Sequence, residues 1–159
     1  YLNSEQTDPE LKDDAQLIAG KSAFFLNDYL NAQKYLSVLS HKSTNDLSAE
    51  AAYYCALIEY NQGNYDACEK IITEILAAKY SSSYWLASTF ILYGDFYVAK
   101  GNNFQACHTY QSIVDNYDGE DLREIARQKI AQIDQSEKPV APQPGENENL
   151  KPIDEDEED

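Results

Sequence analysis

Gly63-Asn64-Tyr65-Asp66-Ala67-Cys68 is one copy of a short pattern that recurs along the chain, because stretches of the same kind begin at Asn27 and at Gly101. Each starts with Gly or Asn, has polar and aromatic residues next, and has a small residue five positions after the first. The starts lie 36 and 38 residues apart, which is the spacing of a repeated helix pair. Since Gly and Asn suit a left-handed helix C-cap, each stretch is predicted to join two helices.

A second small residue lies seven positions before each turn, at Gly20, Ala56 and Gly94. Small residues before and after the turn let the two helices of a pair approach closely, since larger side chains would hold them apart. The aromatic residues near the start of each second helix are predicted to fill the gap beside the turn; they are Tyr29, Tyr65 and Phe104.

The rest of the chain also favours helices. Apolar residues recur every three or four positions, and no Asn-Gly or Asp-Gly hairpin signal lies between alternating apolar runs. The predicted fold class is therefore all-α. We place helices at residues 10–26, 29–40, 47–62, 64–79, 82–100, 103–117 and 119–134. The last of them is apolar on one side and charged on the other, as expected for a helix that caps an array of repeats.

This pattern resembles the tetratricopeptide repeat over about residues 13–117. The resemblance implies a right-handed superhelix of antiparallel helix pairs, with three repeats followed by the capping helix 119–134. It also implies a non-enzymatic scaffold or adaptor that binds a protein or peptide partner. Residues 83–117 are similar to the C-terminal segment of large tetratricopeptide-repeat proteins of Bacteroidetes, which are generally exported to the cell envelope. We therefore expect a periplasmic or cell-envelope location, with the cytoplasm as the alternative.

Charge divides the chain into two parts. The formal net charge is −16, which disfavours nucleic acid and anionic lipid as partners. No run is long and apolar enough to predict insertion into a membrane. Residues 135–159 hold nine acidic residues, two lysines and four of the five prolines, so they are predicted to form a disordered acidic tail behind a helical domain of residues 1–134. The chain has no Met, and we expect a mature product or a piece of a longer protein with further repeats before Tyr1.

Catalytic and metal-binding motifs are missing from the sequence. The spacing of the cysteines and histidines fits no metal site, and no phosphate-binding loop or nucleophile motif occurs. The acidic residues in 115–121 do not follow the spacing of a calcium loop and are better explained as a helix cap. We predict no cofactor, no metal and no enzymatic activity. Cys55 and Cys68 are expected to be buried, and a bridge between them is left open.

The first helix of each pair is expected to line the concave groove of such a superhelix. The predicted partner-binding groove consists of the residues on these helices that the hairpin contact does not use: Leu17, Lys21, Phe24, Tyr53, Leu57, Tyr60, Asn61, Ile91, Asp95 and Val98. Tyr97 and Tyr110 are assigned to the core. Because the groove offers few cations, a carboxylate clamp for acidic peptides is disfavoured.

Two alternatives remain open at this point. The chain could be a structural C-terminal end-cap of a longer array whose binding surface lies upstream. It could also be an enzyme or ligand-binding helical domain, which should have a deep pocket with converging polar groups.

Overall fold

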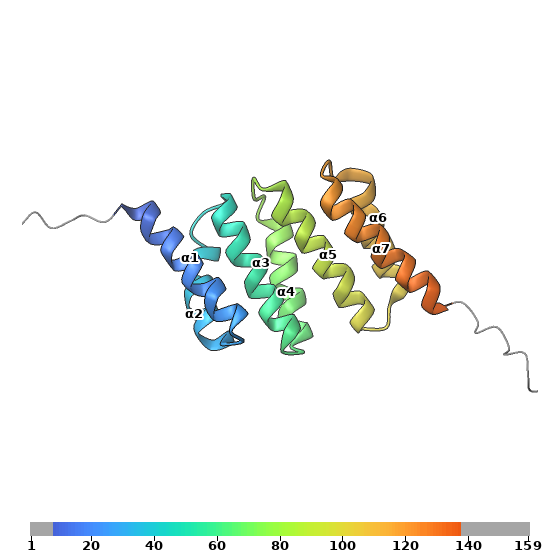
Figure 1. The fold of residues 1–159 in the computed structure, drawn as a ribbon, viewed down its shortest axis with the longest axis horizontal. Helices are drawn as coiled ribbons and strands as arrows, with labels where there is room; N and C mark the ends of the chain where they lie inside the picture. The colour runs from blue at the N-terminus through green and yellow to red at the C-terminus, as the bar shows by residue number, and fades with distance from the viewer. Residues whose placement is uncertain (1–7, 138–159) are drawn as a thin grey trace, which may run out of the picture.

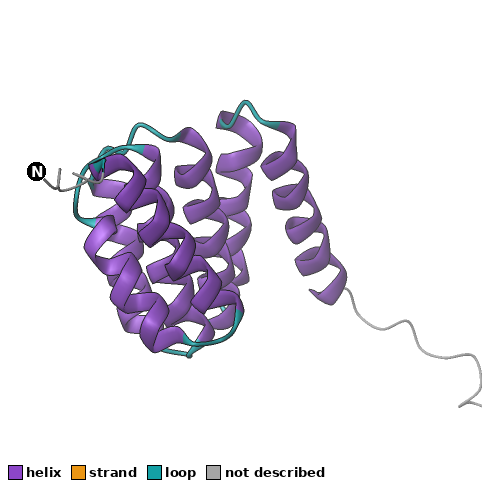
Figure 2. Ribbon diagram, turned by 60° about the vertical axis from the view of Figure 1, so that its left-hand side comes forward, coloured by secondary structure: helices purple, strands orange, loops and turns teal. Residues whose placement is uncertain are grey.

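The computed structural model describes residues 8–137, and they form seven helices. The helices follow one another in chain order along the long axis of the molecule (Figure 1), and the loops gather at the two ends of the helices (Figure 2). Every helix boundary lies within three residues of its predicted position, so the all-α prediction is confirmed. The helices are α1 (Pro9–Phe25), α2 (Tyr29–Ser40), α3 (Asp46–Asn61), α4 (Tyr65–Ala77), α5 (Ser83–Ala99), α6 (Asn103–Asn116) and α7 (Glu120–Glu137).

The three predicted turns end their first helices in the same way. Asn27, Gly63 and Gly101 have positive φ angles of 60°, 75° and 74°, which is the left-handed conformation that a Schellman cap requires. At the middle turn, the amide of Gly63 donates to the carbonyl of Tyr60, and the amide of Asn64 donates to the carbonyl of Glu59. The prediction of left-handed C-caps is therefore confirmed.

Small residues hold the two helices of each pair close together. A Cβ atom built on Gly94 would lie only 2.2 Å from Cε1 of Tyr110, and one built on Gly20 would lie 2.6 Å from Cγ of Leu36. The small residues after the turns are fully buried: Ala32, Cys68 and Ala106. Close approach of the paired helices at these positions thus follows directly from the repeated sequence pattern.

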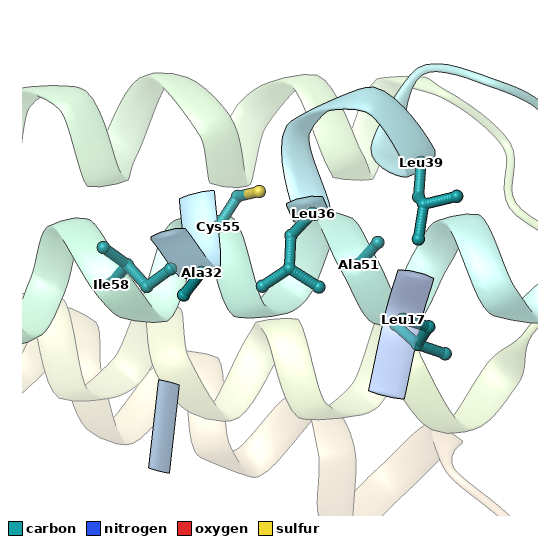
Figure 3. Packing of buried hydrophobic residues seen from close by; sticks show 7 residues of the cluster. All are labelled: Leu17, Ala32, Leu36, Leu39, Ala51, Cys55 and Ile58. Atoms are coloured by element: carbon teal, nitrogen blue, oxygen red, sulfur yellow. The ribbon is translucent and has the colours of Figure 1, made fainter. Parts of the chain in front are cut away.

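The first helices form one layer of the array. Within residues 8–137, the backbone of α3 contacts those of α1 and α5, and α5 also contacts α7, whereas α2, α4 and α6 do not contact one another. Each second helix instead packs between its own first helix and the next one. Figure 3 shows side chains at this contact, where Leu17 of α1, Leu36 and Leu39 of α2, and Ala51 of α3 belong to one buried cluster.

Some sequence-based predictions need correction. The prediction that Phe104 fills the gap beside its turn is wrong, because its side chain is 77% exposed. Phe104 lies three positions after Gly101, whereas Tyr29 and Tyr65 lie two positions after their turn starts, so Phe104 points to another side of its helix. Tyr110 is buried and Tyr97 is partly buried against the same cluster, as predicted.

The cysteines are free thiols, so the bridge left open between Cys55 and Cys68 does not form. A disulfide bond between them is absent because Cys55 and Cys68 belong to different buried clusters. At the C-terminal end, α7 continues to Glu137, three residues beyond its predicted end. The prediction of a disordered tail over residues 135–159 is therefore wrong for residues 135–137, which belong to α7, and the rest of the predicted tail lies outside the described residues. No helix in the described range has the length and apolar character needed to cross a membrane.

Candidate partner-binding face

A continuous series of six aromatic rings crosses the layer of first helices from α1 to α5. Neighbouring ring centroids are 5.0 to 5.6 Å apart, and the contacts are edge-to-face or tilted, as favourable aromatic pairs are. We call this series the aromatic track. In spatial order its rings belong to Phe25, Phe24, Tyr54, Tyr53, Trp85 and Tyr84.

The aromatic track ends in a shallow hollow of about 260 Å³ between α3, α5 and α7. Its lining is almost entirely aromatic and aliphatic: Tyr53, Tyr54, Tyr84, Trp85, Ser88, Ile91, Leu122 and Ile125. Tyr84 and Ile125 are 42% and 41% exposed, so large apolar side chains are open to solvent here. Burial among these apolar side chains raises the pKa of Tyr53 to about 12.

The structure separates the predicted groove residues into several environments. Phe24 and Tyr53 belong to the aromatic track, and Ile91 lines the hollow. Leu17, by contrast, lies in the core beside α2 and α3 and is only 9% exposed, so it offers little surface to a partner. Val98 is exposed near the C-terminal end of α5.

Leu57, Tyr60 and Asn61 lie toward the turn that follows α3. Leu57 packs against the buried cluster between α3, α4 and α5. The hydroxyl of Tyr60 donates to the backbone carbonyl of Asp95 at 3.4 Å, and the side-chain amide of Asn61 donates to the hydroxyl of Tyr29, also at 3.4 Å. These contacts join neighbouring repeats.

The two predicted charged residues are each paired within the protein. Lys21 Nζ lies 2.5 Å from Glu50 Oε1, and this carboxylate raises the pKa of the lysine. Asp95 Oδ1 lies 2.7 Å from Lys129 Nζ and accepts a hydrogen bond from the Tyr110 hydroxyl at 2.5 Å. Neither lysine is therefore free for a partner's carboxylate, which favours an uncharged contact surface.

Sequence reasoning missed six of the eight residues that line the hollow, namely Tyr54, Tyr84, Trp85, Ser88, Leu122 and Ile125. Trp85 and Tyr84 come from the start of α5, and Leu122 and Ile125 come from the capping helix. Trp85 is the sole tryptophan of the chain, which is a compositional signal that could have drawn attention to it. Nothing in the sequence pattern predicts that α7 supplies the far wall, because this depends on how α7 stacks beside α5.

A larger hollow of about 480 Å³ lies on the other layer, between α2, α3 and α4. Its polar groups are largely committed to internal bonds: the Tyr80 hydroxyl donates to the Ser40 carbonyl at 2.8 Å, and the Ser40 hydroxyl lies 2.8 Å from His41 Nδ1. Burial raises the pKa of the Cys55 thiol in its wall to about 12, so the thiolate nucleophile is suppressed. The described residues contain no group of three or more side chains suited to hold a metal ion.

The fold and its aromatic face define a helical-repeat protein whose notable surface is apolar. The family model described as a tetratricopeptide repeat-like domain matches residues 2–135. The chain therefore belongs to the tetratricopeptide repeat-like family, as its turns and small residues predict. Comparison with curated proteins and with solved structures gives no match.

Proposed function

We propose that the chain is a non-enzymatic scaffold or adaptor that binds a protein or peptide partner along the aromatic track. The observation that carries this proposal is the open hollow at the end of the track, where Tyr84 and Ile125 remain exposed beside the indole of Trp85. Aromatic residues are enriched at protein interfaces because they give a large contact area for few rotatable bonds. A helical-repeat fold of this family is typical of proteins that hold other proteins.

The chemistry of the face favours an apolar or aromatic partner segment. The ion pairs Lys21–Glu50 and Asp95–Lys129 lie on the same layer of helices, and each is neutral as a pair. An acidic peptide would have to break one of these pairs to contact Lys21 or Lys129. The segment that fits best presents an uncharged apolar side chain to the hollow between α3, α5 and α7.

We also propose that this binding serves a cell-envelope assembly. Support comes from the similarity of residues 83–117 to exported tetratricopeptide-repeat proteins of Bacteroidetes, described above from the sequence. Fractionation of the native cell tests the location, and recovery of the chain in the cytoplasmic fraction would contradict it.

The test of binding compares three forms of the full chain as bait in native cell extract: the unchanged chain, Ile125→Asp and Phe104→Asp. Both substitutions place a charge at an exposed apolar residue, but only Ile125 lines the hollow. A partner retained by the unchanged chain and by Phe104→Asp, and lost with Ile125→Asp, supports the proposal. Its affinity for the three forms is then measured by titration calorimetry. Equal affinity for all three forms would overturn the proposal.

The end-cap function is the second candidate, and the outer surface of α7 favours it. Arg127 on that helix is paired with Glu120 at 2.6 Å and with Glu124 at 3.2 Å, so the surface is polar, as at the end of a repeat array. Under this alternative, charge substitutions in the hollow leave partner binding unchanged.

A further inference from the structure

The side of α1 that faces away from α2 and α3 exposes large apolar side chains. Leu11 and Ile18 are 63% and 65% exposed, and the small residues Ala15 and Ser22 continue the same stripe. The spacing of four, three and four residues places all four on one side of the helix. We call these four residues the outer stripe of α1.

The corresponding stripe of α3 is covered by the preceding helix pair. The residues of the outer stripe lie 16, 12, 9 and 5 positions before Asn27. The residues of α3 at the same distances before Gly63 are Leu47, Ala51, Tyr54 and Ile58. Ala51 and Ile58 are completely buried, in one cluster with Leu36 and Leu39 of α2.

The stripe of α5 is covered in the same way. Counting back from Gly101 gives Trp85, Thr89, Leu92 and Phe96. Thr89, Leu92 and Phe96 are all buried, and Leu92 shares a cluster with Ile72 and Ile75 of α4. In both later repeats, this stripe therefore receives the second helix of the pair before it.

We propose that the outer stripe of α1 is a docking surface for the second helix of one further tetratricopeptide-type helix pair, seated as α2 is seated on α3. Two of the four positions have the same residue in both helices, since Leu11 and Ala15 correspond to Leu47 and Ala51. The helix that fits is amphipathic, with apolar residues spaced like Leu36 and Leu39.

The described chain cannot supply this helix to a second copy of itself. The second helices α2, α4 and α6 already pack against α3, α5 and α7, respectively. The outer surface of α7 is polar and does not match an apolar stripe.

An extended chain tests the proposal with an internal control. A copy of residues 8–43 is inserted before Asp8, so that the outer stripe of the original α1 takes the positions that Leu47, Ala51, Tyr54 and Ile58 have in α3. The copied α2 can then pack on the original α1. Ile18→Asp is made either in the original α1, where the residue takes the partly buried position of Tyr54, or in the copied α1, where it still faces solvent.

The expected result is one unfolding transition, with a midpoint about 5–10 °C lower for Ile18→Asp in the original α1 and at most about 2 °C lower for the copied α1. Equal midpoints for the two substitutions would show that the stripe takes no helix, and would overturn the proposal. Sedimentation equilibrium of the unextended chain provides a second measurement. A dimer that Ile18→Asp dissociates would overturn the proposal too, because the occupant would be a second copy. Neither result affects binding at the hollow between α3, α5 and α7.

Discussion

Replacing Gly94 by Ala should destabilise the protein, although alanine is the better helix former. Gly94 lies in the middle of α5, and Cβ of an alanine there would lie 2.2 Å from Cε1 and 2.6 Å from Cδ1 and Cζ of Tyr110. The Tyr110 ring cannot move away easily, because it is buried and its hydroxyl donates to Asp95 at 2.5 Å. The clash must therefore be relieved by a shift of α5 against α6.

The change in the free energy of unfolding for Gly94→Ala is the difference between two opposing effects. Overpacking of a close-packed interior typically costs about 1–3 kcal/mol, and a contact of 2.2 Å belongs at the upper end of that range. The higher helix propensity of Ala relative to Gly offsets about 1 kcal/mol of this cost. The net loss in the free energy of unfolding is then about 1–2 kcal/mol, or a decrease of roughly 3–8 °C in Tm.

Urea denaturation followed by circular dichroism measures this loss, and a double-mutant cycle with Tyr110→Leu identifies its cause. In the Tyr110→Leu background the ring is absent, so Gly94→Ala should be neutral or stabilising. Gly20→Ala is a second comparison: its Cβ would meet Leu36 at 2.6 Å, a less severe clash, so it should cost less than Gly94→Ala. An increase in stability for Gly94→Ala in the otherwise unchanged chain would show that paired helices do not require a small residue at this contact.

Three further predictions concern other parts of the molecule. Asp95→Ala removes the partner of Lys129 and of a buried tyrosine, and should lower the urea-derived free energy of unfolding by about 1–3 kcal/mol; an unchanged value would show that the network contributes nothing. Cys107 should react with a disulfide reagent in the native protein at pH 8, while the two buried cysteines should react only after unfolding, because burial raises their pKa to about 12; rapid modification of all three would contradict their burial. Hydrogen bonds from Asn31 lower the pKa of Asp28, so this N-cap stabilises the fold fully above the ordinary carboxyl pKa of 3.8 and loses its effect as the pH falls through the lowered value. Asp28→Asn should remove that part of the pH dependence of stability, and an unaltered curve would contradict the assignment.

The turns were predictable from sequence because their chemistry is local. A left-handed C-cap favours Gly or Asn because of local backbone sterics, and Asn27, Gly63 and Gly101 occupy these positions. The small residues Gly20 and Gly94, seven positions before their turns, were equally predictable, because the geometry of one helix pair fixes this distance. Helix boundaries and the pairing of helices follow from these points.

The residues of the candidate partner-binding face were less predictable from sequence, because their positions depend on contacts between repeats. Leu17 occupies the same position in its repeat as Tyr53 and Ile91, yet it is buried at the core of the first pair. The hollow requires Trp85 and Ile125 to meet, and these residues are 40 positions apart in the sequence. Asp95 was placed in the groove by helix periodicity, but its carboxylate is held by Lys129 from α7. Helix periodicity predicts on which side of its helix a residue lies. It does not predict which side chains of the next helix contact that side.

Amide hydrogen exchange of the full chain, with and without its captured partner, shows whether the partner binds along the aromatic track. We expect slower exchange in the first-helix layer, concentrated in α5 around residues 84–91 and in the first half of α7, where the hollow lies. Exchange that slows only in α2, α4 and α6, on the opposite layer, would contradict this expectation.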